Sequence, residues 1–171
     1  SRRGIHLPGG GYTTAASLHI EHAQRTPEWH AARHGRITAS NAGALLGLSP
    51  FVTRAGAYER LFSELHGLPV DPMQQTPAML RGVVQEDAIV GQFTRETGMR
   101  VRPTGLHTHP LLPFIAASPD GLIEQDAVLE VKSSRRTDLP PHYLIQLMVQ
   151  LACTQRHYAF FVTAHAGRLS T

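Results

Sequence analysis

The chain has 171 residues and a net charge of +3, from 16 basic and 13 acidic residues. Its 42% hydrophobic and 17% charged residues are typical of a soluble globular protein, and its length predicts a single domain. The one cysteine, Cys153, excludes an internal disulfide and a cysteine-based zinc cluster. No apolar run approaches the ~20 residues of a membrane helix, and no signal-peptide pattern is present, so we expect a cytoplasmic protein without membrane contact.

The first half of the chain carries helix signals. Residues 1–24 include Pro8-Gly9-Gly10-Gly11 and predict a flexible arm, so the folded domain is expected to span 25–171. Thr26 followed by Pro27 is typical of a helix N-terminus, and a glycine at position 35 ends that helix. Together, capping residues and apolar spacing predict helices from Thr26 to Gly35, from Thr38–Ser40 to Ser49, over 54–66 and over about 77–97.

After Gly98 the apolar residues no longer follow a helical spacing. Short segments bounded by proline, glycine and aspartate predict strands at 99–107, 114–117, 121–123 and 127–132. Pro140-Pro141 then opens a helix over about 141–154, and an apolar, β-rich segment at 158–163 predicts a buried strand. This order predicts an α/β (α+β) fold, with a mixed β-sheet flanked by helices and helical decoration at the N-terminus.

Charged residues border two of these strands. Strand alternation puts Glu130 and Lys132 on one face and Val131 on the other, in the core. If the strands pair through a turn near 124–126, Asp120 joins the two charged residues. Two carboxylates held close repel unless a cation lies between them, and oxygen ligands without a thiolate favour Mg²⁺ or Mn²⁺. With a lysine beside the cation, this set indicates hydrolysis of a phosphodiester.

A purely structural interpretation stays open, because the pattern is short. Asp120-Gly121 could form only a turn, and Glu130 and Lys132 could form only a solvated strand face. The apolar strands around them favour the functional interpretation, since charges inside a sheet are costly without partners. The histidine pairs His30/His34 and His107/His109 have no third ligand nearby in the sequence, so we expect surface or packing roles for them. Cys153 is expected to be an inert core residue.

Ser118-Pro119-Asp120-Gly121 followed by Glu130-Val131-Lys132 resembles the PD-(D/E)xK nuclease motif. Flanking motifs in the same order resemble the lambda-exonuclease-like group, the YqaJ-type phage recombination exonucleases. They are Gln24-Arg25-Thr26-Pro27-Glu28-Trp29, Arg33, Ile37-Thr38-Ala39-Ser40, Arg81-Gly82, Glu86 and Tyr143-Leu144-Ile145-Gln146. The resemblance covers about residues 24–163 and implies a restriction-endonuclease-like core.

The resemblance also implies residue roles. The metal ligands would be Glu86, Asp120, Glu130 and the backbone carbonyl of Val131, for two Mg²⁺ ions, with Mn²⁺ as the substitute. The catalytic residues would be Asp120, Glu130, Lys132 and Gln146. The contacts to DNA and to its 5′-phosphate would be Arg33, Thr38, Ser40 and Arg81. Arginine binds phosphate through two donors, and a helix that begins near Ser40 presents N–H groups to an anion.

The implied function is Mg²⁺-dependent digestion of linear double-stranded DNA, 5′→3′ from 5′-phosphorylated ends. The product would be 3′ single strands for a single-strand annealing protein, in a bacterial or phage-infected cell. Relatives form a ring-shaped trimer, which implies a homo-oligomer, and they usually continue with a further strand and helix after the segment 158–163.

Other assignments stay open. The chain could be a restriction-like or repair endonuclease of the same fold, although one cysteine disfavours an iron–sulfur version. It could be a non-catalytic DNA-end-binding module. At single residues, Glu86 could be a solvated helix acid, Gln146 and Gln150 could bond only each other, and Arg33 could merely stack on Trp29.

Overall fold

The computed structural model describes residues 19–20, 23–70, 77–134, 138–165 and 168–170. The flexible arm predicted at 1–24 lies outside these residues, apart from 19–20 and 23–24. Among the described residues, no helix is long and apolar enough to cross a membrane.

The five predicted helices are all present. They are α1 (Pro27–Arg33), α2 (Ala39–Leu45), α3 (Arg54–Leu65), α4 (Pro77–Thr97) and α5 (Pro141–Thr154). Threonine side chains cap the first turns of α1 and α3. The Thr26 side chain caps α1 by accepting a hydrogen bond from the N–H of Trp29, at 3.2 Å. Helix α2 ends at Leu45, before the predicted Ser49. The cause is Gly47, whose φ of +74° is the left-handed conformation that ends a helix.

The strands form two sheets rather than one. They are β1 (His19–Ile20), β2 (Ile37–Thr38), β3 (Val101–Arg102), β4 (Leu106–Thr108), β5 (Ile115–Ala117), β6 (Gly121–Ile123), β7 (Ala127–Ser133), β8 (Tyr158–His165) and β9 (Arg168–Ser170). The four-stranded sheet has the order β1-β4-β5-β2, and the five-stranded sheet has the order β3-β6-β7-β8-β9. The strand predicted at 99–107 is therefore divided between the sheets, at Pro103-Thr104-Gly105, where proline offers no N–H for pairing.

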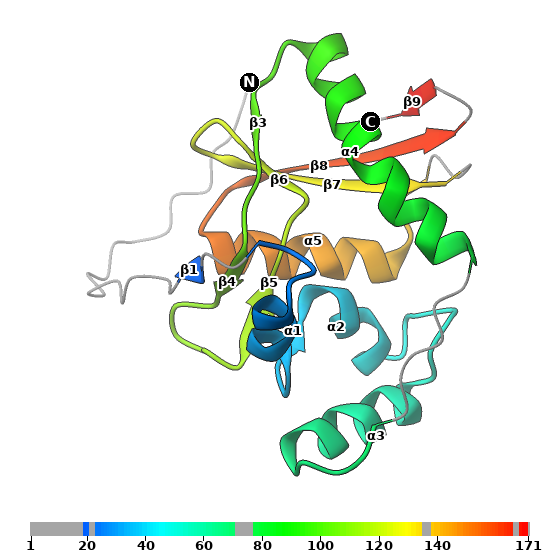
Figure 1. Cartoon of the computed structure of the whole chain (residues 1–171), viewed down its shortest axis with the longest axis vertical. Helices are drawn as coiled ribbons and strands as arrows, with labels where there is room; N and C mark the ends of the chain where they lie inside the picture. The colour runs from blue at the N-terminus through cyan, green and yellow to red at the C-terminus, as the bar shows by residue number, and fades with distance from the viewer. Residues whose placement is uncertain (1–18, 21–22, 71–76, 135–137, 166–167, 171) are drawn as a thin grey trace, which may run out of the picture.

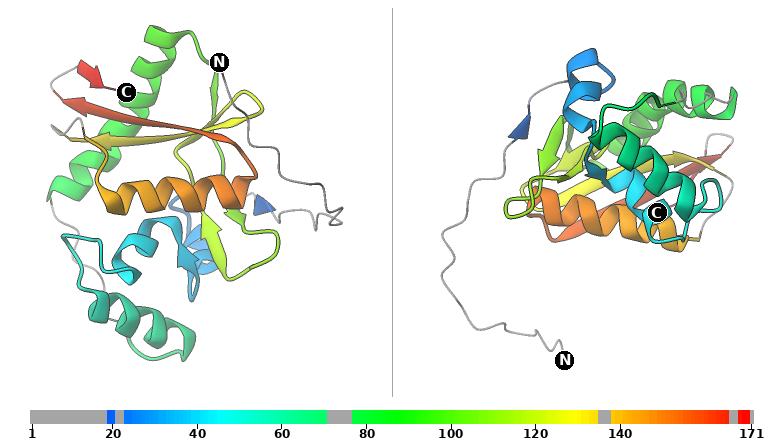
Figure 2. Two further views of the ribbon diagram at one scale, coloured as in Figure 1. Left: turned by 180° about the vertical axis from the view of Figure 1, so that it is seen from behind. Right: turned by 90° about the horizontal axis from the view of Figure 1, so that it is seen from below.

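The five-stranded sheet is mixed, as predicted. Strands β6 and β7 form an antiparallel hairpin, in which Gly121 lies opposite Leu129. Strands β7 and β8 run parallel over their whole length, from the pair Ala127–Tyr158 to the pair Ser133–Ala164. Figures 1 and 2 show β7 and β8 between α4 and α5.

Each face of β7 therefore meets a different helix. Toward α4, Leu129 and Val131 pack against Ile89 and Phe93 in the main hydrophobic cluster. Phe93 is completely buried there. The opposite face of β7 carries Glu130 toward α5. The fold thus covers a charged side chain in the middle of the sheet with a helix.

Candidate active site

The β6–β7 hairpin brings the predicted acidic residues together. Asp120 directly precedes β6, and its Oδ2 accepts a 2.8 Å hydrogen bond from the N–H of Val131 on β7. The next residue has to be small, because a Cβ atom at Gly121 would lie 2.3 Å from Cγ1 of Val101. Asp120-Gly121 is therefore more than a turn signal. It brings strand β6 close to β3 and holds the carboxylate against β7.

Glu130 is almost completely buried, and three donors hold its carboxylate. The Lys132 ammonium and the Gln146 amide both donate to Oε1, the amide at 2.6 Å. The Gln150 amide donates to Oε2, also at 2.6 Å. Glu130 is 2% exposed, so the solvated-face interpretation is wrong for this residue. Val131 points to the opposite side, into the core, as strand alternation predicts.

Burial and neighbouring charges shift the pKa values of Asp120 and Lys132. Burial, and then the charge of Glu130, raise the pKa of Asp120 to about 7, although Lys132, the Val131 N–H and Arg25 act in the other direction. Burial by itself would lower the pKa of Lys132, but the charges of Glu130 and Asp120 outweigh it and raise that pKa. The Lys132 ammonium thus interacts with two buried carboxylates, those of Glu130 and Asp120.

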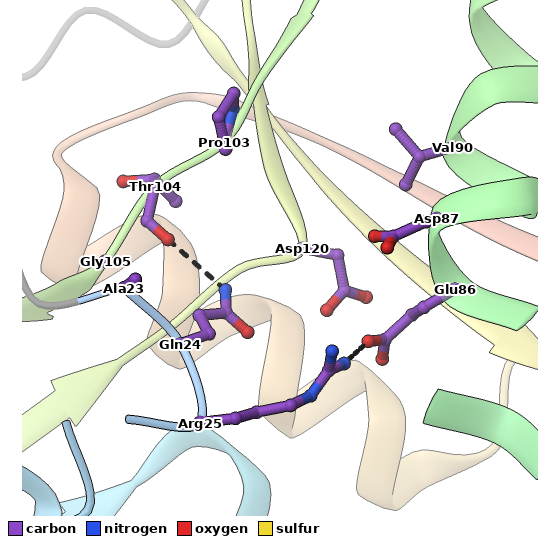
Figure 3. A pocket seen from close by; sticks show the side chains of 10 residues that line it. All are labelled: Ala23, Gln24, Arg25, Glu86, Asp87, Val90, Pro103, Thr104, Gly105 and Asp120. Carbon is purple, nitrogen blue, oxygen red and sulfur yellow. Dashed lines mark hydrogen bonds and ion pairs between the residues drawn. The ribbon is translucent and has the colours of Figure 1, made fainter. Parts of the chain in front are cut away.

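Glu86 on α4 faces the same pocket as Asp120. This pocket has a volume of about 490 Å³ and is lined by Ala23, Gln24, Arg25, Glu86, Asp87, Val90, Pro103, Thr104, Gly105 and Asp120. Figure 3 shows the carboxylates of Glu86 and Asp120 directed into it, with the Arg25 guanidinium paired to Glu86. The Glu86 side chain is only 24% exposed, so it is not a freely solvated helix acid.

The residues at this pocket suit a hard divalent cation by their chemistry. In the described part of the chain, no three His, Cys, Asp or Glu side chains already form a metal cluster. Asp120 nevertheless lines the same pocket as Glu86, and the charge of the buried Glu130 acts on it. A cation there would offset the burial cost and the repulsion that raise the pKa of Asp120.

Three of the four residues predicted to contact DNA form one cluster. Nη2 of Arg33 donates to Oγ of Ser40 at 2.9 Å, and the hydroxyl oxygens of Thr38 and Ser40 lie 3.1 Å apart. The Arg33 guanidinium also lies over the Trp29 ring, 4.1 Å from its centroid, so the stacking contact considered from the sequence is present beside the contact with Ser40. The side chain of Arg81 lies outside the described part of the chain.

Burial lowers the pKa of Arg33 to about 10, and the charges of Glu64 and Glu130 partly offset that effect. Arg33 therefore keeps its positive charge at neutral pH. Because the charge of Glu130 acts on Arg33, the phosphate-binding candidates and the acidic residues are electrostatically connected.

Sequence reasoning missed the roles of two residues. Gln24 donates to the backbone carbonyl of Pro119 at 2.7 Å and so anchors the segment that precedes α1 beside Asp120. Gln150 binds Glu130 instead of bonding only to Gln146. Two amides spaced by four residues on an apolar helix, opposite a strand that carries one glutamate, are the signal that could have found this contact.

His30, His107, His109 and Cys153 make packing or hydrogen-bond contacts, as expected. His107 is buried and its Nε2 lies 2.6 Å from Oγ1 of Thr104, whereas Nδ1 of His109 accepts backbone N–H groups of the following turn. The ring of His30 packs edge-on against Trp29, at 4.9 Å between centroids. Cys153 is completely buried, and burial raises the pKa of its thiol to about 12, so it stays protonated.

The fold resembles those of known proteins. Two crystal structures of LHK-Exo, an alkaline exonuclease from Laribacter hongkongensis, resemble the chain at 30% identity. The complex with dAMP has a TM-score of 0.72 over 82% of this chain and 75% of that protein. The other structure has a TM-score of 0.70, over 81% and 73%. Comparison with curated protein sequences finds no match.

A family model, the YqaJ-like viral recombinase domain, matches residues 28–157. The matched segment contains the β6–β7 hairpin, Glu86 on α4 and the two glutamines of α5 that bind Glu130. Over this length, the chain belongs to the YqaJ-like viral recombinase domain family.

Proposed function

We propose that this protein is a divalent-metal-dependent exonuclease that digests linear double-stranded DNA in the 5′→3′ direction from 5′-phosphorylated ends. The observation that carries the proposal is the convergence of Asp120 with the Glu130–Lys132 pair across the β6–β7 hairpin. The likeness to LHK-Exo, an alkaline exonuclease, supports the same activity.

The metal ions, taken to be two Mg²⁺, would be held by Asp120, Glu130, the Val131 carbonyl and Glu86. Bound there, they would supply a Lewis acid for the phosphate and lower the pKa of the attacking water. Lys132 keeps its proton beside Glu130 and adds positive charge where the phosphorane would develop negative charge. Gln146 positions Glu130, to which it donates its hydrogen bond.

The cluster of Arg33, Thr38 and Ser40 supports the proposed 5′→3′ direction of digestion. Its guanidinium and the hydroxyl of Ser40 offer donors to a terminal phosphate, and the N–H groups at the start of α2 add a partial positive charge. An end held by its 5′-phosphate would be digested from that end. The product is a 3′ single strand, which a strand-annealing protein would take over, and a ring of several copies of the chain would keep the enzyme on the duplex.

The decisive experiment is a time course on linear duplex DNA labelled at the 5′ or the 3′ end. We expect nucleotide release in Mg²⁺ and none in EDTA, early loss of the 5′ label, late loss of the 3′ label, and faster digestion of 5′-phosphorylated ends. Asp120→Asn is the matched inactive control. Cleavage of covalently closed circular DNA would identify an endonuclease, and DNA-end binding without any release would identify a non-catalytic module.

A further inference from the structure

Arg25 has an unusual backbone conformation at the entrance to the pocket. Its φ is +70°, in the left-handed region that residues other than glycine rarely adopt. Hydrogen bonds on both sides of Arg25 hold this turn. Gln24 donates to Pro119, and the Thr26 hydroxyl donates to the Ala23 carbonyl at 2.8 Å. The turn is thus fixed beside Asp120, and the strained residue is the one that projects into the pocket.

The charge of Arg25 contrasts with that of the other pocket residues. The ionisable side chains that line the pocket are Arg25, Glu86, Asp87 and Asp120. The guanidinium pairs with Oε2 of Glu86, as Figure 3 shows, and its charge also acts on Asp120. Arg25 is therefore the cation among these four residues, and it is bound to a carboxylate that the proposed function assigns to a metal ion.

We propose that Arg25 is a built-in counter-ion that competes with a divalent metal ion for Glu86. This inference rests on the proposed function. A guanidinium and a metal ion cannot share one carboxylate oxygen closely, because both are cations and would repel each other at contact distance. Arg25 neutralises the charge of Glu86, so a metal ion that binds at Glu86 has to displace the guanidinium.

The exposure of the pair makes this exchange feasible. The Arg25 side chain is 43% exposed and that of Glu86 is 24% exposed, so solvent can reach the pair. Ion pairs of this kind are weak. The competition should therefore shift metal affinity by about two- to fivefold instead of blocking the site.

The test measures Mn²⁺ binding without DNA, by electron paramagnetic resonance of the free ion. Arg25→Gly removes the guanidinium, and glycine adopts the same φ without strain. Arg25→Gln removes the charge and keeps a long side chain. We expect both variants to bind Mn²⁺ about two- to fivefold more tightly than the wild type at the site that includes Glu86. The control is Arg54→Gln, which removes an exposed positive charge on α3, a helix that does not line the pocket, and should leave the affinity unchanged.

A second comparison ties the effect to Glu86. In a Glu86→Gln background, adding Arg25→Gly should no longer change Mn²⁺ affinity, because the shared carboxylate is gone. Unchanged or weaker Mn²⁺ binding in folded Arg25→Gly or Arg25→Gln would overturn the inference. Failure of the proposed function looks different, since the wild type itself would then release no nucleotides from linear duplex DNA, whatever the Mn²⁺ affinity of the Arg25 variants.

Discussion

The side-chain amide of Gln150 donates a 2.6 Å hydrogen bond to Oε2 of Glu130 and so connects the middle of α5 to β7. Gln150 is completely buried, and Glu130 is 2% exposed. A buried carboxylate is tolerated only with partners, and here two amides and an ammonium supply them. Helix α5 therefore fixes the orientation of the carboxylate that the proposed mechanism needs.

Gln150→Leu keeps the volume of the side chain and removes the donor. We expect turnover to fall about 10–100-fold, the range found when a group that orients a metal ligand is lost. The free energy of unfolding should fall by roughly 1–3 kcal/mol, because an oxygen of Glu130 loses its partner. Gln125→Leu, in the exposed β6–β7 turn, is the matched control. Turnover and Mn²⁺ affinity equal to the wild type in Gln150→Leu would show that Gln146 and Lys132 suffice.

Asp120→Asn tests the role of Asp120 in hydrolysis without removing its hydrogen bond to the Val131 N–H. The amide oxygen can still accept the Val131 N–H, while the negative charge that would bind metal is lost. We expect no measurable hydrolysis, with a melting temperature in EDTA at pH 8 equal to or above that of the wild type, since the buried charge is gone. Nucleotide release near the wild-type rate would refute the metal-site assignment.

Glu130→Ala is a poorer test of the same site. It leaves the Gln146 and Gln150 amides without their acceptor and the Lys132 ammonium without its counter-charge. Breaking a buried ion pair from one side costs about 3–5 kcal/mol, so loss of activity would be mixed with loss of the fold.

Local sequence signals were sufficient for most helix boundaries and for the β6–β7 hairpin. Helix α4 ends before Gly98 and helix α5 begins at Pro141, as predicted, and the β6–β7 turn lies at 124–126. These features depend on neighbours in the chain, which capping, periodicity and turn residues report directly.

Contacts between distant segments could not be predicted in this way. The pairing of Arg25 with Glu86 joins a turn before α1 to the long helix α4, and neither residue carries a local signal for the other. The strand predicted at 99–107 is divided between two sheets because its two halves pair with different strands. The β propensity of the segment does not indicate which strands these are. The role of Gln150 likewise depends on how α5 is rotated over β7.

Metal ions should change how stability depends on pH. The raised pKa of Asp120, about 7 against its usual 3.8, means that the metal-free fold binds a proton more readily than the unfolded chain does. The free energy of unfolding in EDTA should therefore fall as pH rises through about 4 to 7. Mg²⁺ binds the ionised carboxylate, so its stabilising effect should grow over the same range.

Melting temperatures from pH 5 to 8, in EDTA and in Mg²⁺, check this relation. The difference between the two conditions should increase with pH in the wild type and be largely lost in Asp120→Asn. A Mg²⁺ effect that is equal at every pH in both proteins would contradict the assignment of Asp120 as a metal ligand.

The final prediction concerns Arg33, which lies between the Trp29 ring and the Ser40 hydroxyl. A terminal phosphate bound there would gain charge-assisted hydrogen bonds, each worth about 1.5–3 kcal/mol, or roughly 10–100-fold in rate preference. Arg33→Ala should therefore remove most of the preference for 5′-phosphorylated over 5′-hydroxyl duplex, by slowing the phosphorylated substrate. Arg33→Lys should restore only part of it, because an ammonium lacks the planar pair of donors.

The comparison to make is the ratio of digestion rates on the two substrates, measured beside the melting temperature of each variant. Ser40→Ala removes a neutral hydroxyl and should lower the ratio less than Arg33→Ala does, since the guanidinium carries the charge. Arg33 also stacks on Trp29, so both Arg33 variants are expected to melt at a lower temperature than the wild type. If Arg33→Ala slows both substrates equally and leaves the ratio unchanged, the contact with Trp29 is the whole role of Arg33, and the 5′-phosphate has to be bound elsewhere.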